Sequence, residues 1–370
     1  MTNFEERYTA LNGCYTQGAG IHIQETNIDV RFFHFNSRIC NEMNETWLTD
    51  NAIGENLFFD YPVFIPSGKT KHDKAILLLH GLNERSWSKY LPWAEYLCYH
   101  TGKPVILFPI AFHMNRSPLS WSDPRNLINL LGFRRERYHD DRFISLANVA
   151  LSDRISRNPE RFYLSGRQTW IDLTSLFGEI KTGRHPLFKE GTQIDLFAYS
   201  IGAFLSQIAL MANQKGLYSD SRLFMFCGGS IFRSMQGISR SIMDRAAFDK
   251  LQEYYILHFG SERVTGWRRD KGFNAFCRMI SPERGQGERE DFFNRISKRI
   301  SGIVLAKDTV IPYHGVEEAL GTTNTETSIT LLDFSFPYTH ENPFPLHIED
   351  INSVNTAFRT IFSQAVEFLV

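Results

Sequence analysis

The chain of 370 residues has few cysteines and no two of them in close spacing. The five, an odd number, are Cys14, Cys40, Cys98, Cys227 and Cys277. A disulfide framework or a zinc site requires cysteines that are paired or clustered in the sequence, so neither is indicated. The cysteine pattern therefore predicts a reducing compartment.

Long apolar runs are also missing. No stretch contains the roughly 20 consecutive apolar residues that a transmembrane helix requires. Glu5 and Glu6 lie where a secretory signal would carry basic residues followed by an apolar run. We therefore expect a cytoplasmic protein with no membrane span.

Neither sign of charge is in excess. Forty basic and forty-one acidic residues give a formal net charge of −1. Proteins that bind nucleic acid or anionic membranes carry a broad basic surface, so the composition does not predict a nucleic-acid partner. The local basic run at residues 134–137 is interrupted by Glu136, and such runs usually lie on solvated helix faces. A small, near-neutral ligand fits this composition better.

The sequence motifs of nucleotide and metal chemistry are absent. There is no G-x-x-x-x-G-K-[ST] loop, no H-E-x-x-H pair and no G-x-G-x-x-G placed after a strand pattern. The sequence therefore predicts no metal and no cofactor.

Short apolar runs are present, and they alternate with helical patterns. Runs of this length bounded by polar residues are typical of strands buried on both faces of a parallel sheet. The predicted strands lie at residues 57–65, 75–79, 104–110, 194–198, 223–227, 303–306 and 329–334. Helical spacing is found at 87–100 and 354–369. This order predicts an α/β fold with a mostly parallel, doubly wound sheet.

The predicted domain organisation is one domain at residues 57–370, preceded by an N-terminal extension of uncertain structure at 1–56. Two segments, about 111–190 and about 231–300, are longer than a crossover between strands needs, so we expect helical insertions at the ligand end of the sheet. The second is a lid candidate, with a helix-start signal at Ser241 and Asp244 and a polar, mobile piece at 281–291. A solvated surface excursion is the alternative.

The strongest functional motif is the segment Ala198-Tyr199-Ser200-Ile201-Gly202, which joins a strand pattern to a helical one. A serine on so sharp a turn is exposed at the carboxyl end of the sheet, and small residues two positions before and after it let the strand and helix approach. Ala198 and Gly202 satisfy that requirement. A buried serine in an ordinary strand–helix turn is the alternative.

This segment resembles the G-x-S-x-G nucleophile elbow of the α/β-hydrolase superfamily, with Ala198 in place of the first glycine, and the order of elements resembles that family over roughly residues 57–370. The resemblance implies that Ser200 is a nucleophile and that the backbone N–H of Ile201 stabilises an oxyanion. His80-Gly81-Leu82 resembles the family's His-Gly loop. It nominates the N–H of Leu82 as the second oxyanion donor, with His80 and Gly81 supporting the loop.

The superfamily's chain order is serine, acid, histidine. His340, which follows the predicted strand at 329–334, is then the general base, and Asp308, at the end of the strand at 303–306, is the carboxylate that orients it. Two alternatives stay open, because His347 follows the same strand as His340 and Asp333 lies close to it in the sequence.

The predicted function is that of a serine hydrolase that acts on an ester, thioester or amide of a small-molecule acyl substrate through an acyl-serine intermediate. A carboxylic ester is the favoured substrate. An acyltransferase, a peptidase and a non-catalytic binding protein on the same fold are the alternatives. The sequence does not define the acyl group, the leaving group or the oligomeric state.

Overall fold

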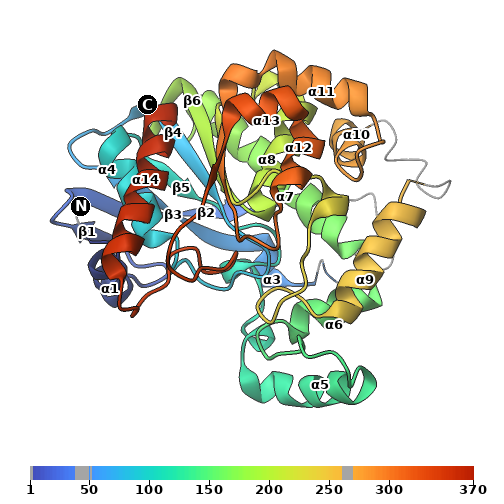
Figure 1. Ribbon diagram of the computed structural model, residues 1–370. Helices are drawn as coiled ribbons and strands as arrows, with labels where there is room; N and C mark the ends of the chain where they lie inside the picture. Colours follow the sequence, from blue (N-terminus) through green and yellow to red (C-terminus); the bar gives the residue numbers. More distant parts are fainter. Residues whose placement is uncertain (1–2, 38–49, 51, 261–269) are drawn as a thin grey trace.

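The computed structural model describes residues 3–37, 50, 52–260 and 270–370, so Cys40 lies outside the described residues (Figure 1). Its centre is a nine-stranded sheet with the order β1-β2-β3-β5-β4-β6-β7-β8-β9. The strands are β1 (Ile21–Ile23), β2 (Ile28–Asn36), β3 (Phe58–Pro66), β4 (His72–Leu79), β5 (Val105–Leu107), β6 (Phe188–Tyr199), β7 (Leu223–Phe226), β8 (Ile300–Leu305) and β9 (Ile329–Leu332).

The strands from β5 to β9 in this order are parallel, with pairings such as Leu77↔Leu196 and Phe197↔Phe224. Residues 75–79 are buried throughout, as a strand covered by helices on both faces requires. Each of the seven predicted strands overlaps a strand of this sheet. The predicted α/β class and the mostly parallel sheet are confirmed.

The other edge of the sheet is antiparallel and includes part of the predicted N-terminal extension. All nine residues of β2 pair with β3, from Ile28↔Pro66 to Asn36↔Phe58, and β1 pairs with β2. The sheet therefore continues across the predicted boundary at residue 57, and residues 21–36 of the predicted extension contribute two of its strands. Buried Val30 beside exposed Arg31 reflects a strand that is only partly covered.

Helices cover both faces of the sheet (Figure 1). On one face α1 (Phe4–Cys14), α4 (Leu91–Thr101) and α14 (Ile351–Leu369) share one hydrophobic cluster with the sheet. On the other face α7 (Arg161–Lys181) and α8 (Ile201–Ala212) share a second cluster with it. The doubly wound arrangement and the final helix are thus confirmed. The short helices are α3 (Gly54–Leu57), α12 (Tyr313–Leu320) and α13 (Thr322–Ser328).

Both long segments between strands contain helices. The first insertion, residues 108–187 between β5 and β6, holds α5 (Pro124–Arg137), α6 (Val149–Arg157) and α7. The second insertion, residues 227–299 between β7 and β8, holds α9 (Arg245–Glu253), α10 (Lys271–Arg278) and α11 (Gln286–Arg295). In Figure 1, α5, α6 and α9 lie together below the sheet. Of the described helices, none is long and apolar enough to cross a membrane.

Two local predictions in the second insertion need correction. Asp244, and not Ser241, caps α9, since its side chain accepts the N–H of Ala247. The polar piece at 281–291 is not a free loop, because its second half forms the start of α11 and Arg289 is fully buried. The Arg289 guanidinium donates to backbone carbonyls of this piece and of α12, including those of Pro282 and Glu318.

The basic run at residues 134–137 is only partly solvated. Arg135, Glu136 and Arg137 are exposed as expected, whereas Arg134 is buried. The Arg134 guanidinium forms two hydrogen bonds to the Asp244 carboxylate, of 2.8 and 2.6 Å. This correction follows from the amphipathic position of Arg134 on α5, and the pair joins the two insertions.

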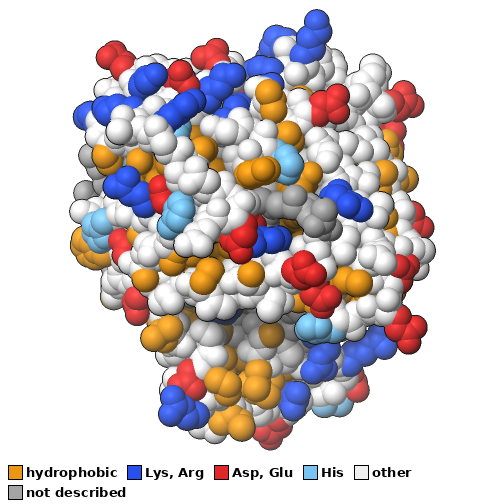
Figure 2. Space-filling view, turned by 90° about the vertical axis from the view of Figure 1, so that its left-hand side faces the viewer, with side chains coloured by type: hydrophobic (Ala, Val, Ile, Leu, Met, Phe, Trp, Pro, Cys, Tyr) orange, Lys and Arg blue, Asp and Glu red, His pale blue; other side chains and the backbone are white. Residues whose placement is uncertain are grey.

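The face of the molecule drawn in Figure 2 carries basic and acidic side chains interspersed with hydrophobic ones. Hydrophobic side chains gather at its lower end, at the height of α5 in Figure 1. Leu119, Ile128 and Phe133 of this region are all exposed.

Candidate active site

Ser200 lies on the turn between β6 and α8 with φ 54° and ψ −122°. Positive φ is rare for a residue with a side chain, and such strain concentrates at functional sites. The turn is also tightly enclosed. A Cβ on Gly202 would lie 2.8 Å from the Cβ of Leu79, and one on Gly228 would lie 3.1 Å from the N of Ser200. The small residues around Ser200 are therefore a steric requirement of this turn.

Three predicted site residues meet at this turn although they are far apart in the sequence. The Nε2 of His340 lies 2.7 Å from the Oγ of Ser200, and its Nδ1 lies 2.8 Å from the Oδ2 of Asp308. All three residues are buried. The other carboxylate oxygen of Asp308 accepts the N–H groups of Val310 and Ile311, which fixes its orientation. The result is a continuous hydrogen-bonded chain of hydroxyl, imidazole and carboxylate.

The alternative residues lie elsewhere. The imidazole of His347 is 83% exposed and pairs with Glu5 at 2.8 Å. Asp333 pairs with Lys307 at 3.0 Å and accepts the hydroxyl proton of Tyr338. Of the candidate pairs, the geometry thus brings His340 and Asp308 to Ser200.

The loop that carries His340 is held by Tyr199, the residue that precedes Ser200. The hydroxyl of Tyr199 donates to the backbone carbonyl of His340, and the two rings stack with centroids 5.4 Å apart. Burial raises the pKa of Tyr199 well above its usual value, so the hydroxyl keeps the proton that it donates. A second hydrogen bond to the same loop comes from Lys89, which donates to the carbonyl of Glu341 at 3.1 Å. Sequence reasoning did not assign Tyr199 a role, although an aromatic hydroxyl beside the serine was visible.

The loop after β4 is fixed by buried polar contacts. The Nδ1 of His80 donates to the carbonyl of Gly81 at 2.8 Å, and its Nε2 accepts the N–H of Ile110 at 2.9 Å. Burial holds the pKa of His80 well below its usual value, so the ring stays neutral and can make both bonds. The N–H of Gly81 donates to the hydroxyl of Tyr90 at 3.0 Å.

Leu82 and Ile201, whose backbone N–H groups are the predicted oxyanion donors, line the same cavity as Ser200. Ile201 is the first residue of α8, so its N–H has no partner within the helix. Such N–H groups at the start of a helix and in an adjacent loop are suited to a developing negative charge.

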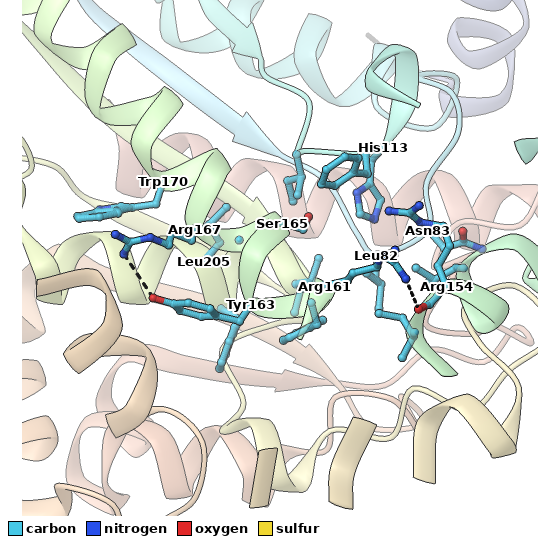
Figure 3. A pocket seen from close by; sticks show the side chains of 18 of the residues that line it. Leu82, Asn83, His113, Arg154, Arg161, Tyr163, Ser165, Arg167, Trp170 and Leu205 are labelled. Carbon is cyan, nitrogen blue, oxygen red and sulfur yellow. Dashed lines mark hydrogen bonds between the residues drawn. The ribbon is translucent and has the colours of Figure 1, made fainter. Parts of the chain in front are cut away.

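Two cavities meet beside Ser200. The one that includes Ser200 is walled by apolar residues of the second insertion, among them Phe232, Met235, Phe248 and Leu251. The other extends between the first insertion and α8 (Figure 3). Leu82, Phe162 and Ile201 line both cavities. The cavity at Ser200 therefore adjoins a larger, mainly apolar cavity.

The second cavity also holds polar residues to which sequence reasoning gave no role. It is lined by Arg85, His113, Arg154, Arg161 and Arg167. Burial lowers the pKa of His113 to about 4, so this imidazole is neutral at physiological pH. Its Nδ1 donates to the carbonyl of Ala111, and its Nε2 has no hydrogen-bond partner in the part of the chain that the structure describes. Among the described residues, no group of three or more potential ligands is arranged to hold a metal ion.

Comparison with solved structures identifies the class of fold. A bacterial heroin esterase is 10% identical with a TM-score of 0.51, over 99% of this chain and 91% of that chain. An esterase from Pseudomonas putida is 8% identical with a TM-score of 0.44, over 99% of this chain and 89% of that chain. A thermophilic carboxylesterase from a metagenomic library is 10% identical with a TM-score of 0.44, over 99% and 95%. The chain has the α/β-hydrolase fold.

Within that fold the sequence defines a narrower group. The model of DUF6051, a family of unknown function, matches residues 39–370, and the chain belongs to this family. No curated protein matches the chain.

Proposed function

We propose that this protein is a serine hydrolase with Ser200 as nucleophile, His340 as general base and Asp308 as the orienting carboxylate. The observation that carries the proposal is the chain of hydrogen bonds of 2.7 and 2.8 Å that joins these three buried side chains. A serine hydroxyl is a weak nucleophile by itself, and an imidazole within hydrogen-bond reach can remove its proton during attack.

The proposed reaction runs through an acyl-serine. The Oγ of Ser200 forms a bond to the carbonyl carbon of the substrate while its proton passes to the Nε2 of His340. The N–H groups of Ile201 and Leu82 donate to the oxygen that becomes negative. When the intermediate collapses, the leaving group takes the proton from His340. A water molecule then loses a proton to His340 and attacks the carbonyl carbon of the acyl-serine. The bond from that carbon to Oγ breaks, the acid is released, and Oγ takes the proton back from His340.

A carboxylic ester of a small molecule is the proposed substrate. The mainly apolar cavities beside Ser200 support it, as does the resemblance of the fold to that of a bacterial heroin esterase. The second insertion acts as a lid in this proposal. Phe248 and Leu251 of α9 form part of the wall of the cavity at Ser200, where they would contact an apolar acyl group.

The first experiment tests the nucleophile. Ser200→Ala is expected to abolish both covalent labelling by a fluorophosphonate probe and hydrolysis of 4-nitrophenyl esters, because no hydroxyl remains at the turn. Ser206→Ala is the matched control, since Ser206 lies on α8 and its hydroxyl donates to the carbonyl of Gly202 in the same helix. Labelling that persists in Ser200→Ala and is lost in Ser206→Ala would move the nucleophile.

The second experiment tests the base and the acid. His340→Ala is expected to remove nearly all hydrolysis, whereas His347→Ala should keep most of it because that side chain pairs with Glu5 at the surface. Asp308→Asn should be severe, since the same exchange in serine proteases lowers kcat by a factor on the order of 10⁴. The opposite result for the two histidines would make His347 the base. Retained activity in both His340→Ala and Asp308→Asn would end the proposal of a triad.

A further inference from the structure

Among the residues that the structure describes, positive charge exceeds negative charge at one end of the cavity next to Ser200. Arg154 and Arg161 both pair with Asp50, at 3.0 and 2.9 Å, so two guanidinium groups share one buried carboxylate. Arg85 lines the same cavity. Arg167 lines it too, but pairs with its own carboxylate, Asp270, at 2.8 Å. The uncompensated charge therefore lies with Arg85 and Arg154.

Arg85 is the least compensated of these groups. Its Nη2 donates to the side-chain carbonyl of Asn83 at 3.0 Å, while its Nη1 is buried and has no hydrogen-bond partner among the described residues. No carboxylate in the described parts of the chain forms an ion pair with it. Burial and the neighbouring charge of Arg154 lower the pKa of Arg85 to about 10, so it is still protonated at neutral pH. Arg85 is half-buried as a whole, but burial of one end of a cation without a counter-ion is costly, and a ligand can supply the missing partner.

The surroundings of Arg154 show which kind of ligand fits. Its guanidinium carbon lies 4.1 Å from the ring centroid of Trp121 and 5.4 Å from that of Phe112. His113 beside them is neutral, so the positive charge at this end comes from arginine alone. The remaining wall is mostly apolar. A ligand with an apolar body and one anionic group matches both parts.

Arg85 and Ser200 line two cavities that share Leu82 as a wall residue. Leu82 lines the cavity of Ser200, the arginine-lined cavity and an outer cleft, and Arg85 lines the last two. In Figure 3, Asn83, His113 and Arg154 lie near Leu82 at one end of the cavity, whereas Tyr163 and Trp170 lie at the other end. A molecule whose carbonyl is at Ser200 can thus pass Leu82 and reach Arg85.

We propose that Arg85, supported by Arg154, binds a carboxylate group carried by the ester substrate. The planar fork of a guanidinium matches the two oxygens of a carboxylate, and a charge-assisted pair of this kind is strong inside an apolar cavity. This inference rests on the proposed function and adds the substrate class to it: esters with a free carboxylate and an otherwise apolar body.

The test compares matched esters that differ only in charge. In the first pair, mono-4-nitrophenyl adipate carries a carboxylate on the acyl side, and its methyl ester is neutral. In the second pair, 4-acetoxybenzoate carries a carboxylate on the leaving group, and its methyl ester is neutral. In at least one of the two pairs, the anionic ester should have a kcat/KM about tenfold or more above that of the neutral ester. Arg85→Gln should lower this ratio at least tenfold, mainly through KM, and Arg85→Lys should restore part of it. Arg125→Gln is the control, since Arg125 is 90% exposed and should keep the ratio.

A binding measurement separates this inference from the proposed function. Calorimetric titration of Ser200→Ala with monomethyl adipate and dimethyl adipate should give tighter binding of the anion, and addition of Arg85→Gln should remove the difference. Failure of every ester to react and of the fluorophosphonate to label Ser200 would end the proposed function, while the titration still decides on the carboxylate site. Equal binding of the two adipates, or equal charge ratios in the native protein and Arg85→Gln, would overturn the inference and leave the hydrolase proposal in place.

Discussion

The two insertions approach the same serine with different chemistry. The first insertion, residues 108–187, places Arg154 and Arg161 beside the cavity next to Ser200. The second insertion, residues 227–299, lines the cavity of Ser200 with apolar side chains, Phe232, Met235 and Phe248 among them. One insertion therefore provides charge, and the other provides an apolar cover.

This difference follows from where each insertion is anchored. Helix α7 of the first insertion starts at Arg161 and packs on the sheet through its buried face, so the charges near its start are held by the rigid part of the fold. Helix α9 of the second insertion is tied to the first through the Arg134–Asp244 pair. Of the guanidinium groups at the cavity, those of Arg154 and Arg161 come from the first insertion and that of Arg85 comes from the loop after β4, whereas the apolar cover of the second insertion tolerates small movements.

The largest expected effect comes from the Arg134–Asp244 ion pair, which joins the two insertions. Arg134→Leu leaves the Asp244 carboxylate buried without its partner, so the free energy of unfolding should fall by about 3–5 kcal/mol. Urea denaturation measures this change. Arg135→Leu, on the exposed side of the same helix, should change it by less than about 0.5 kcal/mol. Equal effects of the two variants would mean that the insertions are joined by other contacts.

A second prediction concerns the neutral, buried imidazole of the first insertion. The pKa of His113 is about 4 in the folded protein against 6.5 for an ordinary histidine, so the unfolded chain takes up a proton first as the pH falls. The free energy of unfolding should therefore decrease between pH 6.5 and 4, by at most about 3 kcal/mol from this group.

His113→Gln should make this pH dependence shallower, as measured by denaturation at a series of pH values. The control is His139→Gln, because His139 lies in the same insertion with an 80% exposed side chain, and it should leave the slope as it is. A slope unchanged in His113→Gln would mean that this imidazole is charged in the folded protein or not buried.

The smallest effect is expected in the apolar cover. Phe248→Leu should cost about 1 kcal/mol of stability and enlarge the cavity of Ser200, which shifts the preference among 4-nitrophenyl esters toward longer acyl chains. The ratio between anionic and neutral esters should stay the same, because the charge recognition lies in the other cavity. Leu257→Ala, at a position 66% exposed in the same insertion, is the control. A changed charge ratio in Phe248→Leu would contradict the division between the insertions.

The parts of the fold that sequence reasoning found are those set by local constraints. Residues 75–79 and 194–198 form continuous apolar runs, and burial on both faces of a parallel sheet is the physical reason for such runs. The turn at Ser200 was recognisable because its steric requirement falls on five consecutive residues. His340 and Asp308 followed from chain order and from their places after predicted strands.

The parts that it missed depend on contacts between distant segments. β2 is only partly covered, so its burial does not produce a continuous apolar run. Arg134 and Arg154 have the sequence pattern of solvated helix residues, and only the packing of α5 and α6 against other elements buries the first and directs the second to the cavity. The lack of a partner for the Nη1 of Arg85 is likewise a property of the folded chain alone.

The distance along the chain between Ser200 and His340 has a consequence for biosynthesis. The two side chains meet across 140 positions, and Tyr199 holds the loop of His340 across nearly the same span. At a synthesis rate of about 5–20 residues per second, the ribosome adds the histidine roughly 7–30 s after the serine. A nascent chain can therefore form the turn around Ser200 well before any base is available to activate it. In the proposed mechanism, hydrolytic activity is acquired only after the segment that carries His340 has been synthesised and has docked onto Tyr199.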